Sequence, residues 1–335
     1  MLEYTLVVET VTLPALVIHG GAGNYLATTS AEQRRERGRR LADIARRAQA
    51  CMTERARDGV MAAIGDLERD PLFNAGRGSR LQRDGVARMS VALADGAQQR
   101  TSAIYNVQDC LNPSELALAL QDAGDRNLDS EGARRLMQTL GITPQDVRTP
   151  RAIERWRRLV ELGETADREA AIGSAGAEAA ERAMDAHLQL PADLEDDGKD
   201  NRFGTVGAVG CDVHGDIWAC TSTGGRGHEP VGRVSDSATP AGNYACPRVA
   251  VSATGFGEQI IDLNVCGRIV TRMLDGADLA RALHRTFGEV AAHGGLLGVI
   301  AIAADGTIGY AHTTEACGVA WCDARGNVHV DAHGR

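Results

Sequence analysis

The sequence GTVGAV at residues 204–209 follows directly on an acidic, turn-rich stretch, PADLEDDGKDNRF, at residues 191–203. Small and β-branched side chains alternate after Gly204, and this period of two predicts a β-strand. The stretch before it has no hydrophobic stripe and predicts a mobile linker. A threonine that opens a strand usually only packs there, because β-branched residues favour strands. The place of Thr205 after a glycine and a linker also permits a chemical role.

That chemical role would be a latent N-terminal nucleophile. A threonine hydroxyl is a weak nucleophile and needs a base, which the α-amino group of the same residue can supply at a pKa of roughly 7.7 to 8.0. Such a group exists only at a chain start, so the hydroxyl of Thr205 would first have to attack the carbonyl of Gly204 and cut the chain. Glycine suits this step because it tolerates a strained conformation and leaves its carbonyl unshielded.

The partner of this strand is predicted at residues 217–223, after a turn at 213–216. The resulting hairpin would place Thr223 across from Thr205, within hydrogen-bond reach. The cluster TSTGG at 221–225 could equally be an ordinary strand end that leads into a glycine turn.

The rest of the chain alternates between hairpins and helical stretches. An apolar strand is expected at 15–18 before a glycine-rich turn at 19–24, further hairpins at 86–93 with 101–107 and at 297–303 with 307–312, and helices over roughly 30–67, 113–190 and, as a pair, 258–290. Short hairpin turns cannot make parallel crossovers, so this order predicts an α+β fold of antiparallel sheets covered by helices.

Two later segments carry residue types suited to binding or to catalysis. In GRVSDS at 232–237, Arg233 could take an α-carboxylate and Asp236 an α-ammonium, although a surface salt bridge would also explain the pair. In ATGFGE at 253–258, a glycine-rich turn leads into a helix. Its backbone N–H groups could face an oxyanion, bind a phosphate or simply cap the helix.

Composition excludes several classes of function. The formal net charge is −9, which disfavours nucleic acid and anionic membranes as partners. The only lysine is Lys199, in the acidic stretch, so neither a P-loop nor a pyridoxal-phosphate site has the lysine it needs. No apolar run approaches a membrane span, and Glu3 and Glu9 stand where a signal peptide would be basic. We therefore expect a cytoplasmic protein.

The cysteines, histidines and N-terminal arginines do not form a recognisable metal-binding or ligand-binding motif. The eight cysteines form no Cys-x-x-Cys and the nine histidines no His-Glu-x-x-His, so a zinc site is poorly supported and reduced, packed thiols are expected. The first helical stretch opens with arginines interleaved with acids, which predicts a solvated face. These arginines are Arg34, Arg35, Arg37, Arg39 and Arg40.

With these motifs together, the chain resembles the plant-type L-asparaginase/isoaspartyl peptidase family of N-terminal nucleophile hydrolases, which is related to the glycosylasparaginases. The resemblance covers nearly the whole chain. It is carried by HGGAG at 19–23, PLFNAG at 71–76, GTVGAV at 204–209, TSTGG at 221–225, GRVSDS at 232–237 and TGFGE at 254–258. Each motif is weak alone, and their common order and spacing make the match.

The resemblance implies a four-layer αββα sandwich and a precursor that cuts itself between Gly204 and Thr205. Residues 1–204, which end in an acidic linker at about 191–204, would form an α subunit, and residues 205–335 a β subunit of the same domain. The two fragments would stay together, and the family usually assembles as an (αβ)2 dimer of such pairs.

The resemblance also assigns catalytic roles. Thr205 would be the nucleophile and, through its amine, the base, while Thr223 would tune it. Thr254 and Gly255 would line the oxyanion pocket with help from Asn74. No organic or redox cofactor is needed for this chemistry, because the protein supplies every group.

Binding roles follow in the same way. The implied substrate-binding residues are Gly225, Arg233, Val234, Ser235, Asp236, Thr254, Gly255, Phe256 and Gly257. Within this set Arg233 would hold the α-carboxylate and Asp236 the α-amino group of an aspartyl moiety. The segment 67–77 resembles a loop whose backbone carbonyls hold a structural sodium ion. The implied ligands are the carbonyls of Leu67, Glu68, Asp70, Phe73, Ala75 and Arg77.

Three positions depart from the family pattern. Ser235 stands where glycine is common, Ser90 stands where the first hairpin usually carries an aspartate, and RGHE at 226–229 replaces a less charged segment with a lysine. These differences concern the part of the site that would hold the leaving group. The preferred substrate, whether asparagine, an isoaspartyl dipeptide or something bulkier, therefore stays open.

The predicted function is hydrolysis of L-asparagine or β-aspartyl peptides through an aspartyl-threonine ester, with release of L-aspartate. The alternative within this chemistry is a glycosylasparaginase-like hydrolase, against which the expected absence of a secretion signal counts. A remote alternative is a non-catalytic protein whose glycine-rich turns bind a small phosphorylated ligand.

Overall fold

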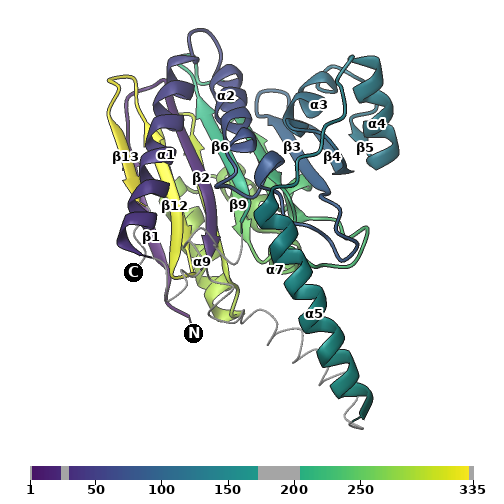
Figure 1. The fold of residues 1–335 in the computed structure, drawn as a ribbon. Helices are drawn as coiled ribbons and strands as arrows, with labels where there is room; N and C mark the ends of the chain where they lie inside the picture. The colour runs from purple at the N-terminus through teal and green to yellow at the C-terminus, as the bar shows by residue number, and fades with distance from the viewer. Residues whose placement is uncertain (1, 24–29, 173–203, 332–335) are drawn as a thin grey trace.

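The computed structural model describes residues 2–23, 30–172 and 204–331 (Figure 1). The predicted acidic linker at 191–203 lies outside the described residues. The strands are β1 (Thr5–Thr10), β2 (Ala15–Gly23), β3 (Met89–Asp95), β4 (Arg100–Val107), β5 (Asn127–Leu128), β6 (Val206–Cys211), β7 (Ile217–Thr223), β8 (Asn243–Cys246), β9 (Val249–Gly255), β10 (Leu297–Ala303), β11 (Thr307–His312), β12 (Ala316–Cys322) and β13 (Val328–Asp331). The helices are α1 (Ala31–Ala50), α2 (Ala56–Arg69), α3 (Pro113–Ala119), α4 (Ser130–Thr139), α5 (Pro150–Ile172), α7 (Gly257–Asp262), α8 (Val265–Leu274) and α9 (Leu279–Ala292), with short 3-10 turns η1 (Gly76–Gly78) and η3 (Asp236–Ala238).

Within these residues the strands form two sheets. The larger has the order β13-β12-β2-β6-β7-β3-β4-β5, and the smaller has the order β1-β11-β10-β9-β8. All three predicted hairpins are present as antiparallel pairs, β3 with β4, β6 with β7 and β10 with β11. The predicted α+β class, antiparallel sheets with helices, is confirmed.

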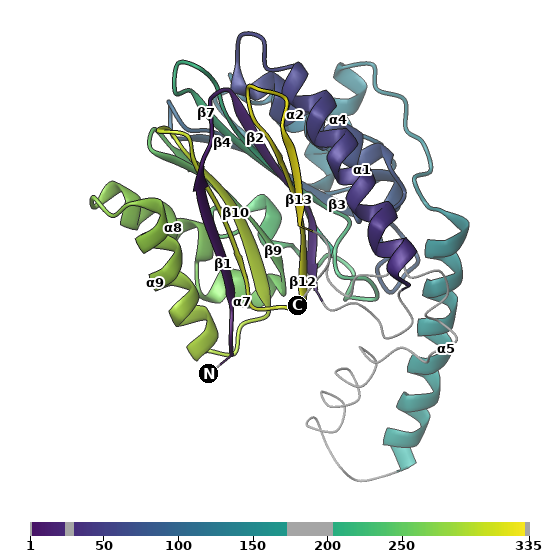
Figure 2. The ribbon, with the colours of Figure 1, turned by 90° about the vertical axis from the view of Figure 1, so that its left-hand side faces the viewer.

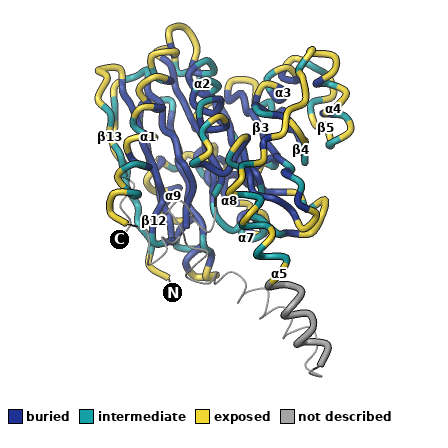
Figure 3. The backbone as a smooth tube through the Cα atoms, in the orientation of Figure 1, coloured by how far each residue is buried: buried dark blue, intermediate teal, exposed yellow. Residues whose placement is uncertain are grey.

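The two sheets pack face to face, because β2, β6 and β7 contact β9 and β10. Side chains alternate along β2, so Leu16 and Ile18 join the core under α1 and α2, while Ala15 and Val17 join the core between the sheets. A third core lies between the smaller sheet and α8 and α9. Figure 2 shows α1 and α2 on one side of the strands and α8 and α9 on the other. Both faces of the central strands are therefore buried, as Figure 3 shows.

Several element boundaries differ from the sequence pattern. The glycine-rich residues 19–23 continue β2 instead of forming a turn, and the helical stretch 30–67 is two helices that pack on each other. The stretch 258–290 holds three helices, not two. Asn264, with φ of 44°, separates α7 from α8, and Gly276, with φ of 97°, lies between α8 and α9, because a left-handed residue ends a right-handed helix.

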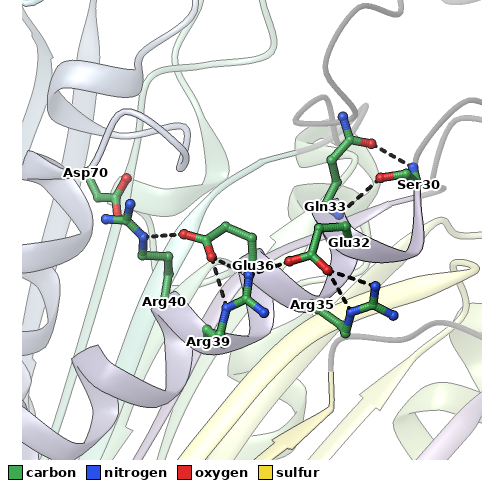
Figure 4. A network of polar contacts seen from close by, with 8 residues as sticks. All are labelled: Ser30, Glu32, Gln33, Arg35, Glu36, Arg39, Arg40 and Asp70. Atoms are coloured by element: carbon green, nitrogen blue, oxygen red, sulfur yellow. Dashed lines mark hydrogen bonds and ion pairs between the residues drawn. The ribbon is translucent and has the colours of Figure 1, made fainter.

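The arginine-rich face of α1 is largely as predicted. Arg35, Arg39 and Arg40 have side chains 53–55% exposed and pair with Glu32, Glu36 and Asp70 (Figure 4). Exposed pairs of this kind contribute about 0 to 1 kcal/mol each. Arg37 is the exception, since it is only 6% exposed. Its guanidinium donates to the carbonyl of Gly20 and lies over the ring of Phe73, so it packs in the interior.

Candidate active site

Thr205 lies immediately before β6 and is buried, with 6% of its surface exposed. Since Val206 pairs with Ser222 across the hairpin, Thr205 falls opposite Thr223 at the end of β7. The Thr205 hydroxyl donates to the Thr223 hydroxyl oxygen at 3.2 Å. The hairpin predicted from the sequence thus brings these two side chains together.

The carbonyl of Gly204 is held by two donors. Asn74 donates its side-chain Nδ2 to this carbonyl, and Thr223 donates its hydroxyl at 3.3 Å. The Thr223 oxygen also accepts the backbone N–H of Gly225 at 3.2 Å, so its proton is free to point at Gly204. Two donors on one carbonyl are what stabilises the oxyanion that forms when a nucleophile attacks it.

We expect Asn74→Ala to slow cleavage at Gly204 by roughly 10²- to 10³-fold, the usual cost of removing one oxyanion donor. The measurement is the fraction of cut chain against time on a denaturing gel after refolding or expression at low temperature. Asn327→Ala is the control, because the Asn327 side chain donates to the side chain of Asp323 in the turn before β13. Cleavage at the wild-type rate in Asn74→Ala would contradict the assignment.

His19 fixes the backbone of Thr205 from the neighbouring strand. Its Nδ1 lies 3.1 Å from the carbonyl of Thr205 and must donate, and its Nε2 lies 2.9 Å from the hydroxyl of Ser252 and must accept. Complete burial lowers the pKa of His19 to about 3, against the opposing hydrogen bond to Thr205, so the ring is neutral. Gly207 permits this contact, since a Cβ there would lie 2.2 Å from Nε2.

Asp236 occupies the start of η3 and is 3% exposed. Its Oδ1 accepts the hydroxyl of Ser235 at 3.1 Å, whereas its Oδ2 is buried with no hydrogen-bond partner among the described residues. Burial raises the pKa of Asp236 to about 6, and Arg233 opposes this rise. A buried carboxylate oxygen without a partner is costly, and a bound ammonium group would satisfy it.

Arg233 lies beside Asp236, because a Cβ at Gly257 would be 2.6 Å from both Arg233 Nη2 and Asp236 Oδ1. The guanidinium pairs bidentately with Glu258 at 2.8 and 3.1 Å instead of with Asp236. Burial lowers the pKa of Arg233, but the bonds to Glu258 outweigh this and the net shift is upward. Sequence reasoning missed Glu258, although it stands at the end of the TGFGE motif.

One cavity collects most of the predicted residues. It has about 260 Å³ of empty space, its mouth included. Its lining residues are Gly204, Thr205, Thr223, Gly225, Arg226, Arg233, Ser235, Asp236, Gly255 and Gly257. The strands β6, β7 and β9 and the turn before α7 therefore meet at one site.

The remaining predicted residues lie at its edge. Thr254 is fully buried in β9, and its hydroxyl accepts the N–H of Ala22 at 3.1 Å. Phe256 stacks with Arg226, whose Cζ lies 5.2 Å from the ring centre. Val234 is 45% exposed, whereas Ser235 and Asp236, which follow it, are buried.

The three departures from the family pattern all touch this region. Ser90 stands opposite Thr223 in the neighbouring strand β3. The hydroxyl of Ser235 donates to Oδ1 of Asp236. In the segment 226–229, Glu229 is buried and accepts the N–H of Arg226 at 3.2 Å. These residues therefore shape the site beside the predicted aspartyl clamp.

The segment 67–77 wraps around Gly76, which has φ of 50°. A Cβ on Gly76 would lie 2.2 Å from the carbonyl oxygen of Glu68 and 2.5 Å from that of Leu111. The carbonyls of Asp70, Phe73 and Ala75 each accept one backbone N–H at 3.0–3.1 Å and retain a second lone pair. The Glu68 side chain faces elsewhere and accepts the hydroxyls of Ser114 and Ser222.

Other classes of site find no support in residues 2–23, 30–172 and 204–331. These residues contain no group of three histidine, cysteine or acidic side chains that could hold a metal ion, and no helix with the length and apolarity to cross a membrane. Seven of the eight cysteines are buried as free thiols, as predicted, and Cys51 is exposed.

Known proteins match the chain over almost its full length. The isoaspartyl peptidase/L-asparaginase of Nostoc sp. is 37% identical over 305 residues, which cover 90% of this chain and 89% of that protein. That of Synechocystis sp. is 37% identical over 309 residues, covering 90% and 85%. The plant-type L-asparaginase of Pyrobaculum calidifontis is 32% identical over 315 residues, covering 92% and 97%.

A model of the asparaginase family matches residues 12–331. The resemblance inferred from the motifs is confirmed, and the chain belongs to the asparaginase family.

Proposed function

We propose that this protein is a self-processing hydrolase that cleaves L-asparagine and β-aspartyl peptides and releases L-aspartate. One observation carries the proposal: the Thr205 hydroxyl contacts Thr223 beside a Gly204 carbonyl that two donors hold, in the same cavity as Arg233 and Asp236. The names of the relatives, isoaspartyl peptidase and L-asparaginase, support the same substrates.

In the first step the Thr205 hydroxyl attacks the carbonyl carbon of Gly204, and Asn74 and Thr223 stabilise the resulting oxyanion. The bond between Gly204 and the nitrogen of Thr205 breaks as that nitrogen takes the proton of the hydroxyl, which leaves an ester between the Gly204 carbonyl and the Thr205 oxygen. Water then hydrolyses this ester and frees the two chain ends. Residues 1–204 then form an α subunit and 205–335 a β subunit of one domain. The helices that cover the outer faces of two facing sheets support a four-layer αββα sandwich of the N-terminal nucleophile hydrolase type.

In the second step the new α-amino group of Thr205 takes the hydroxyl proton, and the hydroxyl oxygen attacks the side-chain carbonyl of the substrate. Asp236 would hold the substrate ammonium group, and Arg233 its α-carboxylate. Thr254 and Gly255, with Asn74, would stabilise the oxyanion. The amine returns the proton to the leaving nitrogen, and water then releases L-aspartate. Every group in this step comes from the protein, and we propose no cofactor for catalysis.

We also propose a structural sodium ion in the loop at 67–77. The carbonyls that crowd Gly76, and those of Asp70, Phe73 and Ala75 with a remaining lone pair, fit a hard cation that prefers oxygen ligands. Leu67 and Arg77 would complete the set. Such an ion would hold Asn74, which lies inside this loop. An (αβ)2 assembly is a further proposal, carried by the family resemblance.

The substrate class is tested by assaying purified protein with L-asparagine, β-aspartyl-leucine and a glycosylated asparagine, with intact mass measured on the same sample. We expect two fragments that split at residue 205, and turnover of the first two substrates. Turnover of the glycosylated asparagine alone would replace the proposal with its glycosylasparaginase-like alternative. A single uncut species without turnover would favour a non-catalytic protein.

A separate prediction concerns Glu258, because it already pairs with the Arg233 guanidinium that the α-carboxylate of the substrate must reach. We expect Glu258→Gln to lower KM for asparagine by about threefold with little change in kcat, since a nearby negative charge disappears. Steady-state kinetics measure both values. The control is Glu289→Gln, which removes a carboxylate in α9 that pairs with Arg268 and Arg272 of α8. A rise in KM would show instead that Glu258 holds Arg233 in its binding position.

A further inference from the structure

A second cavity adjoins the first at Gly204. It has about 650 Å³ of empty space, its mouth included. Gly204 lines both cavities. Four arginines line the second cavity, Arg37, Arg80, Arg151 and Arg155, and none of its described lining residues is an aspartate or glutamate.

The positive charges in this cavity are close enough to affect one another. Burial lowers the pKa of Arg80 to about 10, and Glu229 opposes this effect. Burial and the charges of Arg80 and Arg151 lower the pKa of Arg155 well below its ordinary value. Neighbouring like charges repel, so an anion bound among them would be stabilised.

Contacts made by Arg80 and Trp156 hold parts of the cavity wall in place. Arg80 donates to the carbonyl of Arg226 at 3.0 Å, which ties it to the rim of the first cavity. Trp156 holds the beginning of α5 in place, because its indole N–H donates to the carbonyl of Arg83 at 3.0 Å and its ring packs on Gly85. Arg151 and Arg155 on this helix are therefore presented to the cavity from a held position.

The proposed chemistry places the leaving group in this direction. The amine of Thr205 must return a proton to the leaving nitrogen, so the two nitrogens must come within about 2.6–3.2 Å. Before cleavage that amine nitrogen is bonded to the carbonyl carbon of Gly204, about 1.33 Å away. After cleavage the leaving group must therefore occupy the space that Gly204 held, which opens onto the arginine-lined cavity.

We propose that this cavity is the subsite for the leaving group and that it selects β-aspartyl peptides whose leaving amino acid carries a side-chain carboxylate. The inference rests on the proposed function and adds its substrate class. Arg155 and Arg151 would recognise the carboxylate, while Arg80 would supply a fixed positive charge. The reaction itself is unchanged: the acyl C–N bond breaks, the leaving nitrogen takes the proton, and water hydrolyses the ester.

The test compares β-aspartyl-glutamate with β-aspartyl-glutamine, which differ only in the charge of the leaving side chain. Purified, fully cut protein is used, and kcat/KM is measured for both dipeptides and for asparagine, whose ammonia leaving group is too small to reach the arginines. We expect the wild type to favour the glutamate peptide by roughly tenfold, the size of one charge-assisted contact. In Arg155→Gln the ratio should fall to near one, and Arg155→Lys should restore part of it.

Arg157→Gln is the matched control, since Arg157 is an exposed arginine on the same helix and does not line the cavity. It should keep the wild-type ratio. Equal kcat/KM for the two dipeptides in the wild type would overturn the inference. So would an Arg155→Gln variant in which asparagine and both dipeptides lose activity by one factor, because that marks a structural role. Absence of turnover for every substrate would remove the proposed function, and the inference with it.

Discussion

Thr205→Ala should leave a single chain of 35.4 kDa that is never cut and releases no aspartate. Both losses have one cause, because the same hydroxyl oxygen would attack first the carbonyl of Gly204 and later that of the substrate. Without it there is no nucleophile for either step, and the neighbouring donors on the Gly204 carbonyl have nothing to stabilise. We expect kcat to fall by at least about 10⁴-fold, in the range found when a covalent nucleophile is removed.

Two further variants make this result specific. Thr205→Ser keeps the hydroxyl and should still cut, more slowly, because serine lacks the methyl group that restricts χ1. Thr139→Ala, at the exposed end of α4, should behave as the wild type. Intact mass and aspartate release are measured on all three proteins. A Thr205→Ala chain that is still cut between residues 204 and 205 would contradict both steps of the proposed mechanism.

The meeting of Thr205 and Thr223 could be predicted from the sequence because strand pairing follows a simple rule. Side chains alternate along a strand, and a short turn fixes which residues face each other. The same rule located the β10–β11 hairpin at its observed bounds. Local patterns of this kind are independent of how the rest of the chain folds.

The bidentate pair of Arg233 with Glu258 and the His19 to Ser252 contact could not be found in this way. Each joins residues from separate elements, and their distance depends on how two sheets and a helix pack. His19 was visible as the first residue of HGGAG, but its burial beneath Thr205 was not. Arg37 was assigned to a solvated face for the same reason, since charge patterning does not show that one arginine of a cluster folds inward against Phe73.

The second large effect is expected for Asp236→Asn, which should lower kcat/KM for asparagine by about a hundredfold or more. Its Oδ2 is buried without a partner among the described residues, so the ammonium group of the substrate would complete a desolvated ion pair. Losing one member of such a pair costs about 2–5 kcal/mol. Asp305→Asn, in the exposed turn before β11, is the matched control.

Succinamate, which lacks the α-amino group, has no ammonium for Asp236 to hold. It therefore distinguishes a lost substrate contact in Asp236→Asn from a damaged fold. The variant should turn it over within about threefold of the wild type, and equal losses on both substrates would contradict the assignment.

The pH dependence of the wild type has a definite sign. With a pKa of about 6, Asp236 becomes neutral as the pH falls through that value, so the wild type should lose kcat/KM for asparagine there. The pH profile of kcat/KM for succinamate reports only the protonation of the Thr205 amine. The additional loss of kcat/KM that asparagine shows at low pH should be absent in Asp236→Asn.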